Sequence, residues 1–198
     1  MTRLDDEQTK PDESSTLPGV VAEKALFNAR IITLTGEIND RVAKRVTDSL
    51  LALAADREDP ITLVVSSPGG HVESGDMIHD MIKIVKPRVR VLGTGWCASA
   101  GALIYAAAER ADRYALPNTR FLLHEPRGGV GGAASDVEIQ AREILRMRER
   151  LNRIFATATG QPIERIKVDT ERDYWMSAEQ AKEYGLVGSI ITKMDQLK

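Results

Sequence analysis

Residues 93–104 constrain this chain more than any other stretch, because they join two apolar segments through a turn of small residues. Residues 89–92 lead into the turn, and residues 102–108, which are nearly all apolar, lead away from it. This order predicts a strand, a sharp turn and a buried helix. The hydroxyl of Ser99 is expected at the turn.

Ser99 has two interpretations at this position. A serine at a strand-to-helix junction can be held out of the core, where the first free N–H groups of the helix point toward the atom that its hydroxyl attacks. The nucleophile-elbow pattern matches at Gly101 but not two residues before the serine, where Cys97 stands instead of glycine. From this stretch alone, a serine that caps a buried helix is the simpler interpretation.

Strand-like and helix-like segments alternate along most of the chain. Strands are expected at residues 29–35, 61–66, 89–94 and 186–192, and helices after Asn39 or Asp40, at residues 72–85, from 135 to 159 and from 178 to 184. In the helix at 72–85, Ile78 and Ile82 are expected to face the core, and Asp76, His79 and Lys83 to face solvent. The alternation predicts an α/β fold of βαβ units with a mostly parallel sheet.

One predicted helix is long for a domain of this size. Ser135-Asp136-Val137-Glu138 has the pattern of a capping box, and apolar residues then keep helical spacing until Gly160. This corresponds to about seven turns. We expect such a helix to project from the body or to pack against another subunit. The residues before it, 128–134, are rich in glycine.

Composition sets the class of protein. A chain of 198 residues with 42% hydrophobic content is expected to form one domain with a real core. Lys and Arg number 27 and Asp and Glu number 29, so no basic field favours a nucleic-acid partner. A single cysteine excludes an intrachain disulfide. No apolar run approaches the length of a membrane span.

The N-terminal segment differs in composition from the rest. Residues 1–20 are polar and carry few apolar side chains, so they are expected to form a flexible, solvated segment, with residues 21–198 forming a single domain. Residues 1–13 contain no apolar region of the kind found in a signal peptide. A cytoplasmic location is the default expectation.

Several short motifs occur together in a specific order. The pieces that match are residues 31–38, the Ser67-Pro68-Gly69-Gly70 turn, residues 98–102, residues 116–118, His124 with Pro126, residues 141–145, residues 159–161, and Arg172-Asp173 before residues 184–186. From about residue 30 to residue 191 the chain resembles the proteolytic subunit of the Clp protease. The resemblance implies a ClpP/crotonase-like spiral of βαβ units with a protruding handle helix at about residues 125–160, and axial loops formed by residues 1–20.

The chain offers three histidines as a base for Ser99. His79 lies on the predicted outer face of its helix, which favours a solvated position. His71 follows the glycine pair and could border a site. His124 ends a predicted buried strand beside Pro126, and strand ends are where α/β sheets place their sites. Together with the resemblance, this position makes His124 the predicted base.

The resemblance assigns the remaining roles. It places the orienting carboxylate at Asp173 rather than Asp169, and an inter-ring contact at Arg172. It places the oxyanion donors at the backbone amides of Gly70 and Ala100, and it puts substrate-binding positions at Gly69, His71 and Arg127. Alanine at position 100, where the family commonly carries methionine, is expected to preserve a backbone donor. Cys97 is expected to be a small buried residue.

The resemblance implies acyl transfer to Ser99 and hydrolysis of the acyl-enzyme, with unfolded polypeptides as substrates. No metal and no nucleotide cofactor is expected, and no phosphate-binding Walker pattern is present. The energy for unfolding is expected from an AAA+ Clp ATPase. The implied assembly is two stacked seven-membered rings, made of this chain alone or mixed with a paralogue.

Two other classes of protein remain as alternatives. Crotonase-like acyl-CoA enzymes share the spiral architecture, but a Ser, His and Asp set has no role there. A non-catalytic ring subunit is the second alternative, and the intact set of three residues argues against it. Family members usually present aromatic residues where the ATPase docks, including a tyrosine at the position of His79, so a different docking partner and a mixed ring with a paralogous subunit are alternatives.

Overall fold

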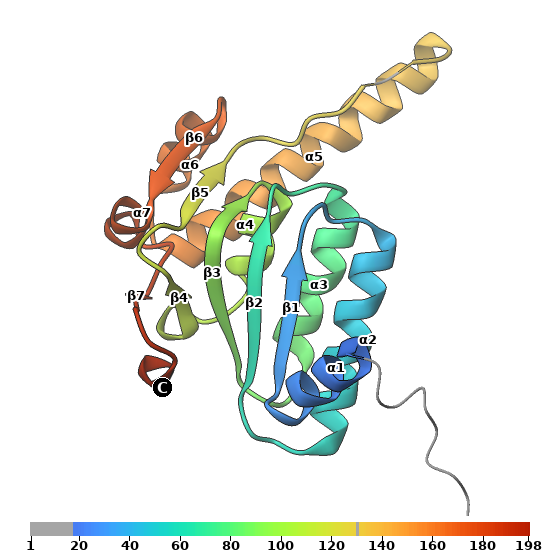
Figure 1. The fold of residues 1–198 in the computed structure, drawn as a ribbon. Helices are drawn as coiled ribbons and strands as arrows, with labels where there is room; N and C mark the ends of the chain where they lie inside the picture. The colour runs from blue at the N-terminus through green and yellow to red at the C-terminus, as the bar shows by residue number, and fades with distance from the viewer. Residues whose placement is uncertain (1–17, 130) are drawn as a thin grey trace, which may run out of the picture.

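The computed structural model describes residues 18–129 and 131–198, and a sheet of seven strands lies at its centre (Figure 1). Five strands run parallel in the order β1 (Ile31–Thr35), β2 (Ile61–Ser67), β3 (Val89–Ala98), β4 (Arg113–Ala115) and β7 (Ser189–Ile190). β-branched residues dominate β2, and most of its side chains are buried. The predicted α/β fold with a mostly parallel sheet is confirmed.

Strand β3 is long enough to pair with two different neighbours. Its first half pairs with β4, and its second half pairs in parallel with β5 (Arg120–Leu123) in the register Trp96↔Arg120. β5 then pairs antiparallel with β6 (Tyr174–Ser177). The sheet therefore divides along β3 into two branches. The larger branch continues through β4 and β7, and the smaller branch consists of β5 and β6.

Helices cover one face of the larger branch and fill the space between the branches (Figure 1). They are α2 (Asp40–Asp56), α3 (Val72–Ile84) and α4 (Ala100–Tyr105), with the shorter α1 (Pro18–Asn28), α6 (Ile163–Thr170) and α7 (Ala178–Tyr184) and the 3-10 turns η2 (Arg110–Asp112) and η3 (Met194–Gln196) around them. Asn39 caps α2 by accepting a hydrogen bond from the Val42 amide at 3.0 Å. Ser177 caps α7 through a complete capping box.

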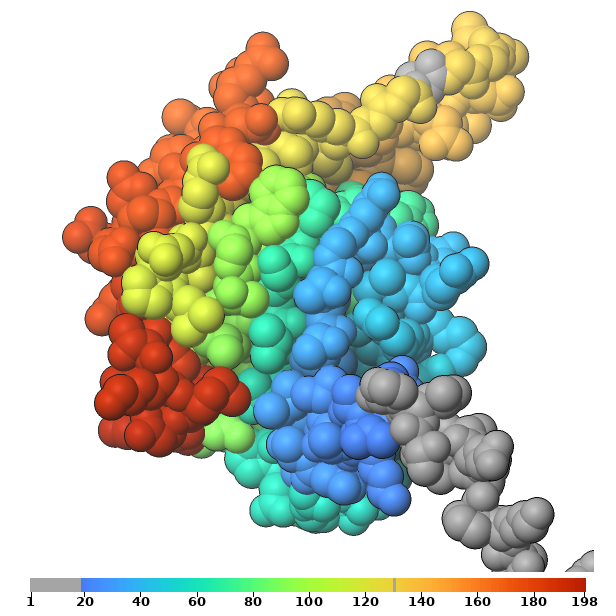
Figure 2. Space-filling view, viewed as in Figure 1, coloured from blue at the N-terminus to red at the C-terminus, as the bar shows by residue number. Residues whose placement is uncertain are grey.

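Helix α5 (Ala134–Thr159) is the predicted long helix, and it projects from the body (Figures 1 and 2). Only its C-terminal part carries buried side chains, at Leu151, Asn152, Phe155 and Thr159. Gly160 ends it in the left-handed conformation, with φ of 74°. The segment after β5 runs outward beside the projecting part, and α5 returns to the body, so the two together form the handle.

The start of α5 contradicts the predicted capping box. The N-cap residue is Ala133, which makes no side-chain cap, because the helix begins two residues earlier than a Ser135 cap would require. Ser135 therefore lies inside the first turn. The closing strand is also shorter than predicted, since β7 covers two residues of the expected 186–192.

The predicted N-terminal segment lies mostly outside the described residues. The solvated segment and axial loops expected of residues 1–17 lie outside the described residues, whereas residues 18–20 belong to α1 instead of to a tail. Within residues 18–129 and 131–198, no helix has both the length and the apolar character that crossing a bilayer requires.

Candidate active site

Ser99 lies at the turn between β3 and α4, as predicted. Its backbone has φ of 54° and ψ of −121°, which is a sparsely populated conformation for a residue with a side chain. Although Ser99 occupies the N-cap position of α4, its hydroxyl makes no cap hydrogen bond. The capping interpretation of Ser99 is therefore wrong, and a strained backbone at a strand-to-helix turn is typical of a nucleophile elbow.

Glycines on neighbouring segments make room for this turn. A Cβ atom on Gly69 would lie 2.6 Å from the Cβ atom of Ser99, and one on Gly101 would lie 3.2 Å from the Cβ atom of Ser67. The Ser67 hydroxyl accepts a hydrogen bond from the Gly69 amide at 3.0 Å, which fixes the loop after β2 against the turn. The elbow thus depends on close backbone approach from two sides.

Cys97 is fully buried in β3, as expected of a small core residue. Burial raises the pKa of its thiol far above the ordinary range, so the thiol stays protonated. Its sulfur faces the Val65 carbonyl oxygen at 3.5 Å. A protonated buried thiol is a poor nucleophile, which leaves Ser99 as the nucleophile candidate at this turn.

The backbone amides of Ala100 and Gly70 are the predicted oxyanion donors: Ala100 follows Ser99 in the chain, and Gly70 follows Gly69, which packs against Ser99. Ala100 is the first residue of α4, so its N–H has no acceptor within the helix. Gly70 forms a parallel bridge with Ile38. In this bridge the Ile38 amide donates to the Gly69 carbonyl and the His71 amide donates to the Ile38 carbonyl, so the hydrogen bonds involve the neighbours of Gly70. This pattern directs the Gly70 N–H away from Ile38. The two predicted oxyanion donors are therefore free of these local pairings.

His124 and Asp173 are brought together by strand pairing. β5 and β6 pair in the register Leu123↔Tyr174, so the next residues beyond this pair are His124 and Asp173. The Nδ1 atom of His124 lies 2.9 Å from the Oδ1 atom of Asp173. Asp169, in contrast, accepts a hydrogen bond from the Tyr184 hydroxyl at 2.7 Å. The geometry favours Asp173 over Asp169 as the partner of His124.

Ser99 and His124 line one small pocket at the meeting point of the two sheet branches. Its other walls are apolar or small side chains from four segments, namely Val72, Ala100, Leu103, Pro126, Leu151 and Phe155. Among the described residues, the Ser99 hydroxyl forms no hydrogen bond with His124. The three predicted residues are thus gathered in one region, with the His–Asp bond formed and the Ser–His bond not formed.

The predicted substrate-binding side chains have other partners. His71 bonds through Nδ1 to the Ser74 hydroxyl at 2.8 Å, and its Nε2 atom lies 3.1 Å from a Glu73 carboxylate oxygen. Arg127 donates through Nη2 to the Oδ1 atom of Asp173. Sequence reasoning missed this last contact, for which the only signal was a cation three residues after His124. Arg172 is exposed beside Asp173.

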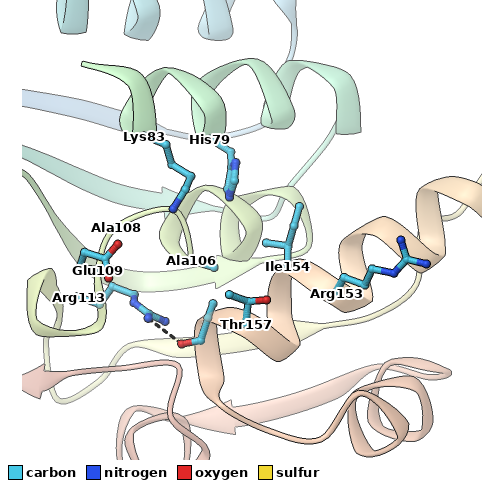
Figure 3. Close-up of a pocket in the computed structure, with 10 residues that line it drawn as sticks. His79, Lys83, Ala106, Ala108, Glu109, Arg113, Arg153, Ile154 and Thr157 are labelled. Atoms are coloured by element: carbon cyan, nitrogen blue, oxygen red, sulfur yellow. Dashed lines mark hydrogen bonds between the residues drawn. The ribbon is translucent and has the colours of Figure 1, made fainter. Parts of the chain in front are cut away.

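His79 does not lie on an exposed face, which corrects the sequence prediction. It is buried, and Figure 3 shows it pointing with Lys83 from α3 into a pocket whose opposite wall is Ile154 and Thr157 of α5. α3 packs against α4, and the residues after α4 also line this pocket, so the buried face of α3 is wider than its own sequence pattern indicates. The pocket also contains Arg113, whose guanidinium donates to the Ala158 carbonyl at 2.7 Å.

His79 does not act as the base for Ser99, because it lines this pocket and Ser99 lines another one. Its Nδ1 atom lies 2.9 Å from the Oδ1 atom of Asp80. In the described part of the chain, no group of three or more His, Cys, Asp or Glu side chains is arranged to hold a metal ion. The groups that the structure gathers around Ser99 are an imidazole, hydrogen-bonded to a carboxylate, and the free amide at the start of α4.

Comparison with known proteins places this site in a family context. The family model described as Clp protease matches residues 19–194. The ATP-dependent Clp protease proteolytic subunit 3 of Rhizobium etli is 59% identical over 190 residues, covering 96% of this chain and 97% of that protein. Subunit 3 of Rhizobium meliloti is 58% identical over 196 residues, covering 98% of this chain and all of that protein (100%).

A solved structure supports the same placement. A point mutant of ClpP1 from Listeria monocytogenes matches with a TM-score of 0.84 and 51% sequence identity. The match covers 89% of this chain and 99% of that one. The predicted ClpP-like spiral with a protruding handle is confirmed by this likeness.

Proposed function

Because the chain belongs to the Clp protease family, it is a serine-type peptidase, and we propose that Ser99, His124 and Asp173 carry its chemistry. The observation that supports this most is the strained turn at Ser99. The Ser99 hydroxyl makes no helix-capping hydrogen bond there, and Ser99 and His124 line the same pocket. The His124–Asp173 hydrogen bond of 2.9 Å adds the second link of a triad.

The reaction follows from this arrangement. Since Nδ1 of His124 donates to Asp173, Nε2 is the nitrogen left to accept the proton of Ser99. The Ser99 oxygen attacks the carbonyl carbon of a peptide bond, and the proton on His124 passes to the departing amine. Water then attacks the acyl-enzyme, again with His124 as the base, and releases the second product. Asp173 stabilises the imidazolium in both steps.

The amides of Gly70 and Ala100 are proposed to bind the oxyanion of the tetrahedral intermediates. Ala100 is adjacent to Ser99 in the chain and Gly70 is adjacent to Gly69, which packs against Ser99, and neither amide is used in the local pairing described above. Backbone donors fixed before the reaction stabilise the developing charge without reorganisation. Alanine at position 100 supplies the same donor as any other residue, so the smaller side chain affects the pocket wall only.

The substrate is proposed to be an unfolded polypeptide chain. We infer that it lies extended beside Gly69 and the Arg127-Gly128-Gly129 segment, pairing with main-chain groups as an added strand. Gly69 is buried against Ser99, so its role is to shape the groove through its backbone. Binding of this kind reads the backbone, and modest selectivity for side chains is expected.

The chain is proposed to act as the proteolytic subunit of an ATP-dependent protease, as the names of its relatives state for those proteins. We propose assembly into two stacked seven-membered rings through the projecting α5, with Arg172 at the contact between rings. A Clp ATPase of the AAA+ class supplies unfolded substrate. Because that partner consumes ATP, we propose the cytoplasm as the compartment.

The test of this proposal is covalent labelling of the nucleophile. Intact-mass spectrometry after treatment with a fluorophosphonate should find one adduct per wild-type chain and none on Ser99→Ala. Cys97→Ala should label like the wild type, because the buried thiol takes no part. An unlabelled wild-type chain would instead favour a non-catalytic ring subunit, or a site that forms only with a partner. Native mass spectrometry of the same sample tests the proposed fourteen-chain assembly.

A further inference from the structure

The carboxylate of Asp173 has two donors, of which the proposed triad uses one. Its Oδ1 atom accepts from His124 Nδ1 at 2.9 Å and also from the guanidinium of Arg127. Within the described ranges, these two side chains supply every hydrogen bond that the Asp173 side chain accepts. The same oxygen atom therefore connects the imidazole and the guanidinium.

The exposure of the three side chains is unusual for a triad. The Asp173 side chain is 43% exposed and that of Arg127 is 65% exposed, whereas that of His124 is 13% exposed. In the well-known serine protease triad the carboxylate is buried, and burial holds it against the histidine. In the single chain, solvent can therefore compete for the carboxylate from the side that Arg127 covers.

Arg127 is held where it can cover that side. Pro126 fixes the backbone dihedral directly before it. One residue earlier, the Glu125 amide donates to the Thr170 carbonyl at 2.7 Å, which ties the segment after β5 to the end of α6. The segment that carries Asp173 follows α6 within three residues. Arg127 and Asp173 thus approach each other from two segments that are already joined.

We propose that Arg127 is a positioning residue, which holds the Asp173 carboxylate against His124 from the solvent side. This inference rests on the proposed function of Ser99, His124 and Asp173. The charge-assisted hydrogen bond from the guanidinium does in this chain what burial does in other triads. Arg127 acts through Asp173 on the orientation of His124, and so on the chemical step.

This role differs from the substrate-binding role predicted for Arg127 from the sequence. A guanidinium that binds the substrate would change KM when it is removed. A guanidinium that positions Asp173 would change kcat, because it contributes after the substrate is bound. The effect is smaller than that of removing the carboxylate itself, since Asp173 keeps its bond to His124.

The experiment compares Arg127→Leu and Arg127→Lys with wild type in hydrolysis of a short uncharged peptide. We expect Arg127→Leu to lower kcat by roughly tenfold to a hundredfold, the range that follows from a misplaced catalytic group, with KM within about twofold. Arg127→Lys keeps a cationic donor and should restore at least part of the lost kcat. Arg153→Leu is the matched control, because Arg153 is similarly exposed and pairs with Glu149 on α5.

A double mutant separates positioning from a general structural effect. In an Asp173→Asn background, Arg127→Leu should cost less than about twofold in kcat, because its target carboxylate is gone. The same fold loss in both backgrounds would overturn the proposal, as would a raised KM with kcat unchanged. Each variant should match wild type in ring assembly and in melting temperature. A variant that loses kcat because it no longer assembles would also count against positioning.

Failure of the proposed function gives a different result. If wild type takes up no fluorophosphonate on Ser99, the triad assignment falls and the positioning role falls with it. If wild type is labelled and the Arg127 variants are labelled at the wild-type rate, the triad stands and only the role of Arg127 is wrong.

Discussion

The Ser99 half of the site lies inside the fold, whereas the His124 and Asp173 half lies at its edge. Ser99 is fixed by close backbone contacts with Gly69 and Gly101 and by the buried strand that precedes it. Asp173 is fixed by two side-chain hydrogen bonds on a half-exposed surface. One half is held by packing and the other by polar contacts that solvent and salt can reach.

The difference teaches where the activity of such a site can be changed. Moving Ser99 requires moving the core, because protein interiors are close-packed. Moving Asp173 requires only the loss of exposed polar contacts, each of which contributes little to the stability of the fold. A partner or substrate that binds beside β5 and β6 can therefore alter the base and its carboxylate while the elbow stays intact.

The largest expected effect comes from the exposed half. Asp173→Asn should lower kcat by about 10³-fold to 10⁴-fold, because the amide no longer stabilises the imidazolium or the required tautomer. Asp169→Asn is the matched control and should change kcat by less than about twofold, since Asp169 pairs with Tyr184 and not with His124. Steady-state hydrolysis of one peptide by both variants checks this. Equal losses would show that the choice of Asp173 over Asp169 is wrong.

The next effect tests the buried half. In Gly70→Ala the new Cβ atom would lie 2.2 Å from the Ile38 carbonyl oxygen at a backbone φ of 147°, so the Gly70 amide must move. Loss of one oxyanion donor should lower the rate of acylation by roughly 10²-fold to 10³-fold. Gly19→Ala is the control, since a Cβ there meets nothing within 4 Å.

Stopped-flow measurement of fluorophosphonate labelling, together with melting temperature, separates the two consequences of Gly70→Ala. A variant that melts like wild type and labels slowly supports the donor role. A variant that labels at the wild-type rate would contradict it. If Gly70→Ala lowers both the melting temperature and the rate while Asp173→Asn lowers the rate alone, the two halves of the site differ in how they are held in place.

Much of the buried half could be predicted from the sequence. The strand, turn and helix around Ser99 follow from local composition, and so do the Asn39 cap and the Ser177 capping box. These features depend on residues within a few positions of one another, which is why short patterns identify them. The buried position of Cys97 follows from the same local pattern.

Two of the errors concern features that depend on distant segments, and the third is local. His79 is buried because α4 and the segment after it pack against α3, and nothing in the periodicity of α3 reports that contact. The Arg127–Asp173 contact joins residues 46 positions apart on the surface, where charged residues are common. Ser135 fits a cap pattern, but the helix extends past it because Ala134 is also a good helix former.

A smaller effect distinguishes the halves by ionic strength. Raising KCl from about 0.05 M to 1 M shortens the screening length from over 10 Å to about 3 Å, which weakens exposed charge pairs more than packed contacts. Wild-type kcat should fall about twofold to threefold, whereas Arg127→Leu should change little because it lacks the Arg127–Asp173 pair. Size-exclusion chromatography at each salt concentration confirms equal assembly. Parallel salt responses in both proteins would show that the pair does not control kcat.

The smallest effect on activity is expected at Cys97, where the consequence is one of stability and pH. Burial raises the pKa of the folded thiol far above its ordinary value of 9.0. The unfolded chain therefore releases this proton above about pH 9 while the folded chain keeps it, so stability falls as pH rises. Cys97→Ala removes this loss and should keep wild-type labelling of Ser99.

Urea unfolding of both proteins at pH 9 and pH 10 measures the effect. Between pH 9 and pH 10 the free energy of unfolding should fall by about 1 kcal/mol more in wild type than in Cys97→Ala, the limit for one proton being about 1.4 kcal/mol per pH unit. Burial is the main cause of the raised pKa of Tyr105, and this contribution lowers alkaline stability in both proteins, whereas the smaller contribution from Cys97 disappears with the thiol. If the free energy of unfolding fell equally with pH in both proteins, the Cys97 thiol would be accessible to solvent in the folded chain. The turn at Ser99 would then not be closely packed, and the contrast between the two halves of the site would be wrong.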